Sequence, residues 1–591
     1  MIPASLFEDP PKDCIDMGEM RMSSSVVRAI DDFCDALSRP PLLPLAQECP
    51  ELADEVFAIK NQAHAPFRVA VHGEVSAGKS SFINAFLGHD LALTDVNECT
   101  SVRSEFEYGK PELQSRPIDV LYRDGHEEWQ EESFRDKLKG KGTDALELAE
   151  KVDKLVFRLD DDKLRNMVII DTPGLNSVVS EHESRALETL GGQSEKMEKL
   201  KKRNESEARK MAATADAVVW ISNENKLERT AQHLDDFIGS VSGGGQSTGQ
   251  RLSACNVLVV LTFADQQNSA EERERRKLDA EKQLNMVLPC NVRVLIVSAG
   301  IERLLQKLDK AKLGKIRDAV KSSFETESDL EEIALGEIPA GFTRQEWSLM
   351  QEGIPWQAFK QAVNILYGAA SLDDGIKNLR SLSGFDGKGG LREALENHFA
   401  SRSDILKCRL ITAKFKKALH EMIHGGITRT KQRIDVARRQ MSDFTRFVIR
   451  HPEYTESTDS PMHKIGEELR MFLSKHNVAD ISEDAERMIN AFLGRLEKPQ
   501  QHLYYLCMRL DGLSTLEDAW DDLSTEEREE LNALFRSEEH TEALQSDFSE
   551  RSIYWGDRAV EESNPAIRLV ASFAKAVYAQ RAFEVRTTHN L

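Results

Sequence analysis

The chain has 591 residues, 40% hydrophobic and 30% charged, and its formal net charge is −22. These proportions are typical of a folded globular protein and exclude a collagen-like or disordered chain. No run of about 18 apolar residues occurs, which argues against a membrane-spanning helix. The negative charge argues against general nucleic-acid binding, which needs clustered Lys and Arg. We therefore expect no nucleic-acid partner. The first residues lack the basic and apolar regions of a secretory signal, so we expect a cytoplasmic location.

Short helices are expected over residues 22–38 and 42–62, and the pattern changes at residue 67. From there, short apolar runs rich in β-branched residues predict buried strands, and polar helical stretches separate most of them. The runs lie at 67–72, 167–170, 217–221, 256–262 and 292–298. Alternating strands and helices predict an α/β fold with a mostly parallel, doubly wound sheet.

After residue 300 the pattern is mostly helical, with a glycine-rich turn over 384–390. The charge of this half is uneven: residues 402–450 hold 13 Lys/Arg against 4 Asp/Glu, and residues 517–550 hold 13 Asp/Glu against 2 Arg. Charge runs usually pair or face solvent, so we favour two stretches that neutralise each other in a helical bundle. The alternative is a basic stretch that contacts anionic lipid head groups.

A phosphate-binding motif, G-x-x-x-x-G-K-[ST], occupies residues 73–80 between a predicted strand and a predicted helix. In such a loop the backbone N–H groups point at phosphates, Lys79 reaches the β- and γ-phosphates, and Ser80 is a ligand of Mg²⁺. The helix N-terminus that follows favours anions. We therefore expect the phosphates to contact Gly73, Glu74, Val75, Ser76, Ala77, Gly78, Lys79, Ser80 and Ser81.

A second phosphate-sensing segment is predicted at 171–174, directly after the apolar run at 167–170. Asp171 can hold Mg²⁺ through water, and the N–H of Gly174 can bind the γ-phosphate and release it when that phosphate leaves. A threonine upstream can complete the metal site, but the spacing alone does not choose between Thr94 and Thr100.

Recognition of the base is expected from residues 261–265, at the end of the fourth apolar run. The carboxylate of Asp265, which follows Thr262, can accept two hydrogen bonds from the N1–H and amino group of guanine. Ser298 and Ala299, at the end of the fifth run, can supply a backbone N–H to the guanine carbonyl. The alternative is an Asp265 that only caps a helix.

Together these motifs resemble the dynamin superfamily of large GTPases, specifically the bacterial dynamin-like proteins, and most nearly their LeoA type. The resemblance is carried by residues 73–85, 171–175 and 215–217, and by the segment 99–102, which selects Thr100 over Thr94. It extends over about 64–300. It implies N-terminal helices over 1–63 that pack with a stalk, a GTPase domain over 64–400 with a helical insertion at about 301–382, and a helical stalk over 401–591.

The resemblance implies a GTPase that binds GTP or GDP with Mg²⁺ and forms a homodimer through its GTPase domains. Its catalytic groups would be Ser76, Lys79 and Thr100, and its metal ligands Ser80, Thr100 and Asp171. The expected partners are membrane lipids, bound peripherally, and a second dynamin-like subunit.

One departure concerns the base motif, because Phe263 stands where the family usually has a Lys whose stem covers the guanine ring. An aromatic ring can stack there instead. The departure favours an alternative function, a nucleotide-gated scaffold that hydrolyses GTP poorly and acts through a partner. A ribosome-associated GTPase is a weaker reading, because it would need a basic RNA-binding module.

Two segments are candidates for a membrane-contact tip, residues 503–508 and 567–583. For both we favour packing inside the helical bundle over contact with lipid. Gly425 and Gly426 mark either a hinge within a long helix or a loop between two helices.

Overall fold

A computed structural model describes most of the chain, which divides into two compact units. The first unit lies within residues 66–239 and 249–406, and the second within 1–65 and 407–591. The described residues are 17–73, 77–92, 102–111, 115–138, 143–172, 215–222, 227, 234, 253–266, 270–288, 291–324, 330, 333, 337–387, 389–451, 461–475, 478–536 and 545–589.

In the first unit, the described strands form a nine-stranded sheet in the order β4-β3-β5-β2-β6-β1-β7-β8-β9. The five predicted apolar runs form one continuous half of it, in which every neighbouring pair is parallel. These strands are β1 (Arg68–Gly73), β6 (Val168–Asp171), β7 (Ala217–Ser222), β8 (Ser253–Leu261) and β9 (Asn291–Ile296). The prediction of a mostly parallel α/β sheet is confirmed, and β1 lies between β6 and β7.

The other half of the sheet is mixed and was not predicted. It comprises β2 (Arg103–Tyr108), β3 (Ile118–Tyr122), β4 (Glu127–Gln130) and β5 (Val152–Leu159). β2 is antiparallel to β6 and parallel to β5, and β3 is antiparallel to both β4 and β5. Charged residues interrupt the apolar pattern of these strands, so periodicity does not reveal them.

Three basic side chains surround one buried carboxylate in this half of the sheet, that of Glu105 on β2, which is 2% exposed. Its oxygens lie 2.5 Å from Arg68, 3.1 Å from Arg103 and 2.8 Å from Lys154. Burial alone would raise the pKa of Glu105, but the three cations, Arg103 foremost, hold that pKa below its usual value. The cluster therefore joins β2 by charge to β5, its ladder neighbour, and to β1, which lies beyond β6 in the sheet.

Glu105→Gln is expected to lower the free energy of unfolding at pH 7 by about 3 kcal/mol, because it leaves three partly buried cations uncompensated. Because the pKa of Glu105 is lower in the folded chain, its stabilisation is present above the unfolded pKa of about 4.3 and is lost as the pH falls through the folded value. Urea unfolding of the full chain at pH 7 and at acidic pH measures this difference.

The matched control is Glu107→Gln, on the same strand, whose carboxylate is half-exposed and lies 3.9 Å from Arg158. This change should cost less than about 1 kcal/mol, as expected of a solvent-screened pair. A deficit in Glu105→Gln that did not shrink on acidification would contradict the account.

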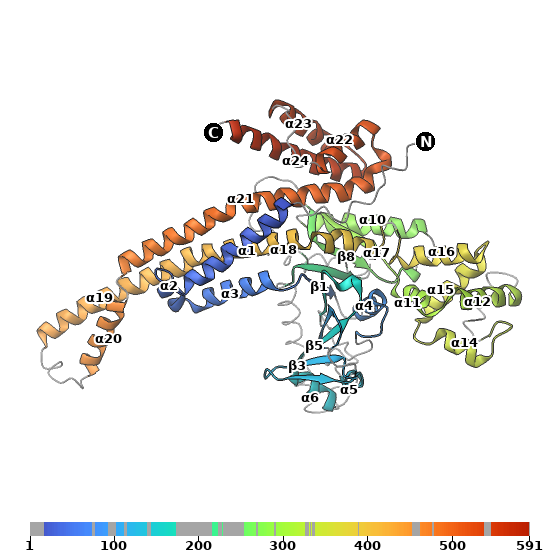
Figure 1. Cartoon of the computed structure of the whole chain (residues 1–591), viewed down its shortest axis with the longest axis horizontal. Coiled ribbons are helices and arrows are strands. Elements are labelled where there is room, and N and C mark those ends of the chain that lie inside the picture. The colour runs from blue at the N-terminus through green and yellow to red at the C-terminus, as the bar shows by residue number, and fades with distance from the viewer. Residues whose placement is uncertain are drawn as a thin grey trace. The chain divides into compact units, whose positions relative to one another are not determined.

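Helices α4 (Lys79–Leu87) and α10 (Ala270–Val287) pack against the sheet. The predicted insertion is helical in its described residues and has its own core, built on Leu304, Phe359 and Leu379. Its helices are α11 (Ala299–Lys307), α12 (Lys310–Ser323), α14 (Arg344–Gln351), α15 (Trp356–Gly368) and α16 (Leu372–Ser383), in green to yellow in Figure 1.

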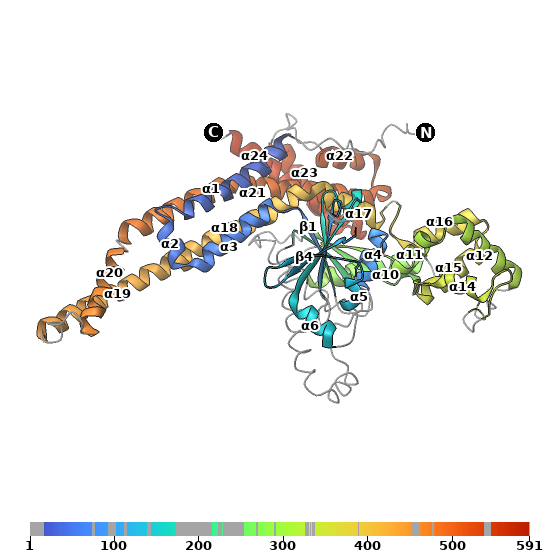
Figure 2. The same ribbon diagram turned by 60° about the horizontal axis from the view of Figure 1, so that its bottom comes forward.

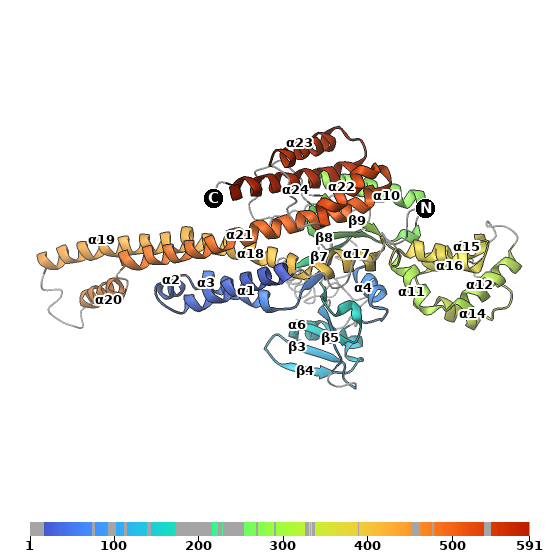
Figure 3. The same ribbon diagram turned by 45° about the horizontal axis from the view of Figure 1, so that its top comes forward.

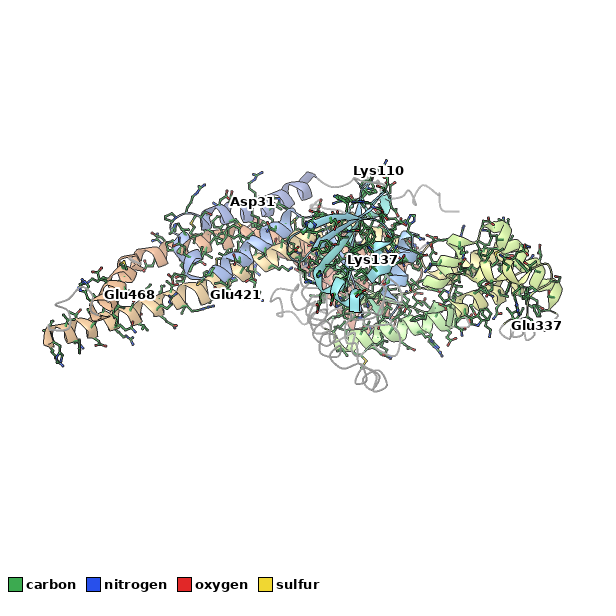
Figure 4. The ribbon with its side chains drawn as sticks, turned by 90° about the horizontal axis from the view of Figure 1, so that it is seen from below. Asp31, Lys110, Lys137, Glu337, Glu421 and Glu468 are labelled. Carbon is green, nitrogen blue, oxygen red and sulfur yellow. The ribbon has the colours of Figure 1, made fainter. Side chains whose placement is uncertain are left out.

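The second unit is helical in all its described elements. Helices α1 (Met17–Leu37), α2 (Leu43–Glu48) and α3 (Pro50–His64) pack beside α18 (Ser403–Glu421) and the 42-residue α21 (Val478–Ala519) (Figures 1 and 2). The ring of Phe33 lies 5.4 Å from Phe415 and 5.0 Å from Phe492, centroid to centroid. Asp31, labelled in Figure 4, joins α1 to α3 through Lys60. The N-terminal helices therefore pack against helices from the other end of the chain.

Gly425 and Gly426 lie inside a continuous helix and form no loop. α18 passes into a π-helix (Met422–Ile427) and then into α19 (Thr428–Arg450) with helical backbone throughout. The space beside Gly426 is limited by Leu45, Cys49 and Leu52 of the N-terminal helices. The segment is therefore a local widening of the helix turn at a packed position.

The two segments considered for a membrane tip lie in the packed part of this unit. α21 meets α22 (Thr525–Arg536) and α24 (Pro565–His589), and α24 also packs on α23 (Gln545–Glu561) (Figure 3). Bundle packing is confirmed for their apolar side chains, which are buried at Leu503, Tyr505, Leu506, Cys507, Met508, Ile567, Val570, Phe573 and Val577. None of the described helices is both long and apolar enough to cross a membrane.

At several positions, residues of the two oppositely charged stretches form ion pairs with residues that belong to neither stretch. In the basic stretch, Arg429, Lys431 and Arg433 pair with Glu51, Glu486 and Glu48. In the acidic stretch, Glu527 and Glu530 pair with Arg558 and Arg551 of α23.

Candidate functional site

The predicted phosphate loop starts at the carboxyl end of β1, which lies between β6 and β7 in the parallel half of the sheet. Gly73 has φ +151°, and a Cβ atom placed on it would lie 2.1 Å from the backbone oxygen of Ile221 on β7. Only glycine therefore fits where the chain leaves the sheet. The chain then enters α4 directly after Gly78, while Glu74, Val75 and Ser76 lie outside the described residues.

Three predicted side chains meet at this edge of the sheet. Lys79 is buried, and its Nζ donates to the backbone oxygen of Gly73 at 3.2 Å. Ser80 Oγ donates to Asp171 Oδ2 at 3.2 Å. Burial raises the pKa of Asp171 to about 6, although the charge of Lys79 and the hydrogen bond from Ser80 act in the opposite direction.

The donor set at this point fits a magnesium ion. The hydroxyl of Ser80 and the carboxylate of Asp171 are hard oxygen ligands side by side, which is the chemistry that Mg²⁺ prefers. A buried carboxylate is also favoured by a cation, because the charged form otherwise lacks solvation. Thr100, the third predicted ligand, its competitor Thr94, and Gly174 lie outside the described residues.

The predicted base-recognition segment is hydrogen-bonded to the phosphate loop. Thr262 Oγ1 donates to the backbone oxygen of Ala77 at 2.9 Å. Asp265 lies in a short 3-10 turn (Ala264–Gln266), where its Oδ1 accepts a 2.6 Å hydrogen bond from Ser298 Oγ. The structure therefore connects the two predicted halves of the site through Thr262.

Of the two backbone donors proposed for guanine, the N–H of Ser298 is engaged, since it donates to the backbone oxygen of Ser383 at 2.9 Å. Ser298 also caps α11, accepting from the N–H of Ile301. Ala299, the first residue of α11, is left as the candidate donor.

The residues around Ser383 form a support that sequence reasoning did not assign. Buried Glu302 accepts from Ser383 Oγ at 2.7 Å and from Arg392 Nη2 at 2.8 Å. Gly384, with φ +69°, follows, and a Cβ there would lie 2.4 Å from the backbone oxygen of Ile296. The only signal in the sequence was the Ser-Gly-Phe turn itself.

A second unassigned contact joins the strands from which the two phosphate-sensing segments emerge. His72, 1% exposed on β1, has Nδ1 2.8 Å from Thr172 Oγ1, and this hydroxyl donates to the backbone oxygen of Val71 at 2.9 Å. The imidazole also lies edge-on to Trp220, 5.0 Å away. Because the Thr172 hydroxyl gives its proton to Val71, we assign His72 Nδ1 as the donor to Thr172. A histidine at the end of an apolar run was the available signal.

His72→Phe and Thr172→Val should each destabilise the chain, and the double variant should lose about 1 kcal/mol less than the sum of the two, because both remove the same hydrogen bond. A double-mutant cycle by thermal unfolding measures this coupling. Ser383→Ala, which removes a different buried hydroxyl, is the control partner and should be additive with His72→Phe. Additivity of His72→Phe with Thr172→Val would show that the hydrogen bond between His72 and Thr172 contributes nothing to stability.

Comparison with known proteins relates the phosphate-binding part of this site to a family. Residues 69–249 match the Dynamin family. A bacterial dynamin-like protein from Nostoc punctiforme is 31% identical over 143 residues, which is 22% of this chain and 20% of that protein. The isoniazid-induced protein IniC of Mycobacterium tuberculosis is 28% identical over 130 residues, or 21% of this chain and 24% of that protein. The matches thus span about a fifth to a quarter of the length of these curated relatives.

One solved structure aligns with this chain at a TM-score of 0.28 and 12% identity, over 97% of this chain and 74% of that one. It is that of an oligomerised bacterial dynamin pair, described as providing a mechanism for long-range sensing and tethering of membranes. The segment 69–249, which contains α4 and Asp171, is a dynamin-family domain, and the chain is a homologue of a bacterial dynamin-like protein.

Proposed function

We propose that this chain is a GTPase that binds GTP with Mg²⁺, dimerises through its GTPase domains and couples hydrolysis to membrane binding. The observation that carries the proposal is the meeting of Lys79, Ser80 and Asp171 at one edge of the sheet. The hydrogen bond from Thr262 to Ala77 supports a base-recognising role for Asp265, which follows Thr262 by three residues.

Each side chain has a role that follows from its chemistry. The ammonium of Lys79 would neutralise the β- and γ-phosphates, and its burial makes that attraction stronger than in water. Ser80 and Asp171 would hold Mg²⁺, which supplies charge neutralisation to the phosphates when bound. Asp265 would select guanine. Ser76 and Thr100 keep the roles that the family resemblance implies, charge neutralisation and water positioning, and Gly174 keeps the γ-phosphate contact expected from its sequence motif.

Lys79→Ala is expected to lower GTP turnover by about 10² or more, since it removes a group that stabilises transition-state charge. Turnover per molecule of the wild type should rise with protein concentration and with anionic liposomes, because two GTPase domains must meet. Phosphate release measured across a wide concentration range tests both. Lys110→Ala, an exposed lysine labelled in Figure 4 that pairs with Asp160, is the matched control and should retain wild-type turnover.

Turnover that stayed flat with concentration and lipid would contradict assembly-dependent hydrolysis. No turnover above Lys79→Ala, with GTP binding that still depends on Lys79, would favour the alternative, a nucleotide-gated scaffold that acts through a partner subunit. The observation that favours this second candidate function, the nucleotide-gated scaffold, is the presence of Phe263 in place of the usual Lys.

For the membrane contact, we propose the far ends of α19 and α20 (Pro461–Lys475), since the segments first considered are buried. In Figures 1 to 3 these ends extend past the N-terminal helices of their own unit. Ile449 is 75% exposed and Met471 62%. Arg446 contacts only Asp443 of its own helix among the ion pairs of the described residues. Exposed apolar and basic side chains together are typical of a helix that lies in an anionic membrane surface.

Arg446→Ala combined with Arg450→Ala should weaken binding to anionic vesicles roughly thirtyfold, at about 1 kcal/mol for each cation near the surface. Ile449→Asp should also lower the fraction of protein that floats with vesicles. Co-flotation with phosphatidylserine and with neutral vesicles measures both effects. Val560→Asp, at an exposed apolar position on α23, is the control. Equal flotation of all variants would exclude this surface.

A further inference from the structure

We propose that Phe263 is the platform on which the purine base of the bound nucleotide stacks, so that this chain recognises its base by an aromatic face together with the Asp265 carboxylate. The inference rests on the proposed function as a guanine-nucleotide-binding protein. It assigns a specificity-determining role to a residue that departs from the pattern of the family.

The backbone of Phe263 is the first observation. Its φ is +66°, and it is the sole non-glycine residue with positive φ in the described part of the chain. A bulky aromatic residue is strongly disfavoured there, because its Cβ crowds the following carbonyl. Strain of this kind persists where the surroundings impose it, and it gathers at ligand clamps and active sites.

The residues on both sides of Phe263 show how the surroundings impose the strain. The N–H of Thr262 donates to Ser222 at 3.1 Å, and its hydroxyl holds Ala77. The N–H of Ala264 donates to Val297 at 3.2 Å, and the Ala264 side chain is fully buried among the insertion helices. The backbone is thus fixed before and after Phe263, so the turn between these anchors sets where its side chain points.

The ring of Phe263 lies at the phosphate loop, and the residue stays partly exposed. A Cβ built on Gly78 would be 3.8 Å from Phe263 Cζ, and the residue is 37% exposed. Because more than a third of Phe263 is exposed, this apolar side chain gains little free energy from burial within the protein, although its backbone is strained. The ring lies beside Gly78 of the phosphate loop, two residues before Asp265 in the chain, and a nucleotide base bound to both would cover it.

The chemistry of the neighbouring groups completes the argument. Every nucleobase has a π-face that stacks on an aromatic ring, but stacking alone does not distinguish guanine from adenine. Selection then falls to Asp265, whose carboxylate is oriented by the 2.6 Å hydrogen bond from Ser298. The ring would supply affinity for the base, and the carboxylate would supply the choice of guanine.

Equilibrium binding of GDP, ADP and tripolyphosphate to the full chain tests this division. Phe263→Ala should weaken GDP binding by about 10- to 100-fold, as expected for loss of one stacked base, and leave tripolyphosphate binding unchanged because that ligand has no base. Phe263→Trp should bind GDP within about threefold of the wild type. Tyr108→Ala, which removes another partly exposed aromatic ring of the same unit, is the matched control.

A second readout uses the strain and does not depend on the nucleotide. Phe263→Gly should raise the melting temperature of the nucleotide-free chain relative to Phe263→Ala, because glycine accepts φ +66° and alanine does not. Both variants should lose GDP affinity equally, since both lack the ring.

The outcomes separate the two levels of the proposal. GDP affinity that is unchanged in Phe263→Ala overturns the platform, and so does an equal loss of GDP and tripolyphosphate binding, which would place the effect in the phosphate loop. Wild-type protein that binds GDP no better than Lys79→Ala overturns the proposed function itself.

Discussion

Lys79 and Asp171 lie buried near one another at the carboxyl edge of the sheet, and the arrangement of the site follows from that constraint. A lone buried charge is costly, so each of the two needs the other or a ligand nearby. The parallel pairing of β1 with β6 supplies this proximity, since Val71 lies opposite Asp171 and the chain turns into the phosphate loop two residues later. The hydrogen bond between His72 and Thr172, one residue after Val71 and Asp171, joins the same two chain segments.

The same physics explains which parts of the fold the sequence could predict. Strands β1, β6, β7, β8 and β9 are buried by the layers around them and therefore read as short apolar runs. β2 and β3 were missed because they carry buried charges such as Glu105 and Asp119, whose partners come from other strands. Likewise, the motifs locate Lys79, Ser80 and Asp171, but the engagement of the Ser298 N–H by Ser383 and the left-handed backbone of Phe263 depend on contacts far along the chain.

The helices of the predicted insertion are connected to the proposed base site. Ala264, in the turn that carries Asp265, is buried in the core formed by α11, α12, α15 and α16. From Asp265 a chain of hydrogen bonds runs through Ser298 and Ser383 to Glu302. Arg392, in α17 (Leu391–His398), then holds the other oxygen of Glu302. The carboxylate proposed to recognise the base is thus connected to Glu302, at the start of the predicted insertion, and to Ser383 and Arg392, which follow it, so we expect the base site to form only when the insertion has folded.

The unbroken course from α18 through the π-helix to α19 has a mechanical consequence. Residues 403–450 form one rod of roughly 70 Å, at about 1.5 Å per residue. A rod of this length acts as a lever: a tilt of about 10° at Ser403 displaces Arg450 by roughly 12 Å. Its weakest point in bending is the π-helix at Gly425 and Gly426, where wider hydrogen-bonded turns replace the tight α-helical ones. Small angular changes at one end are therefore converted into large translations at the other.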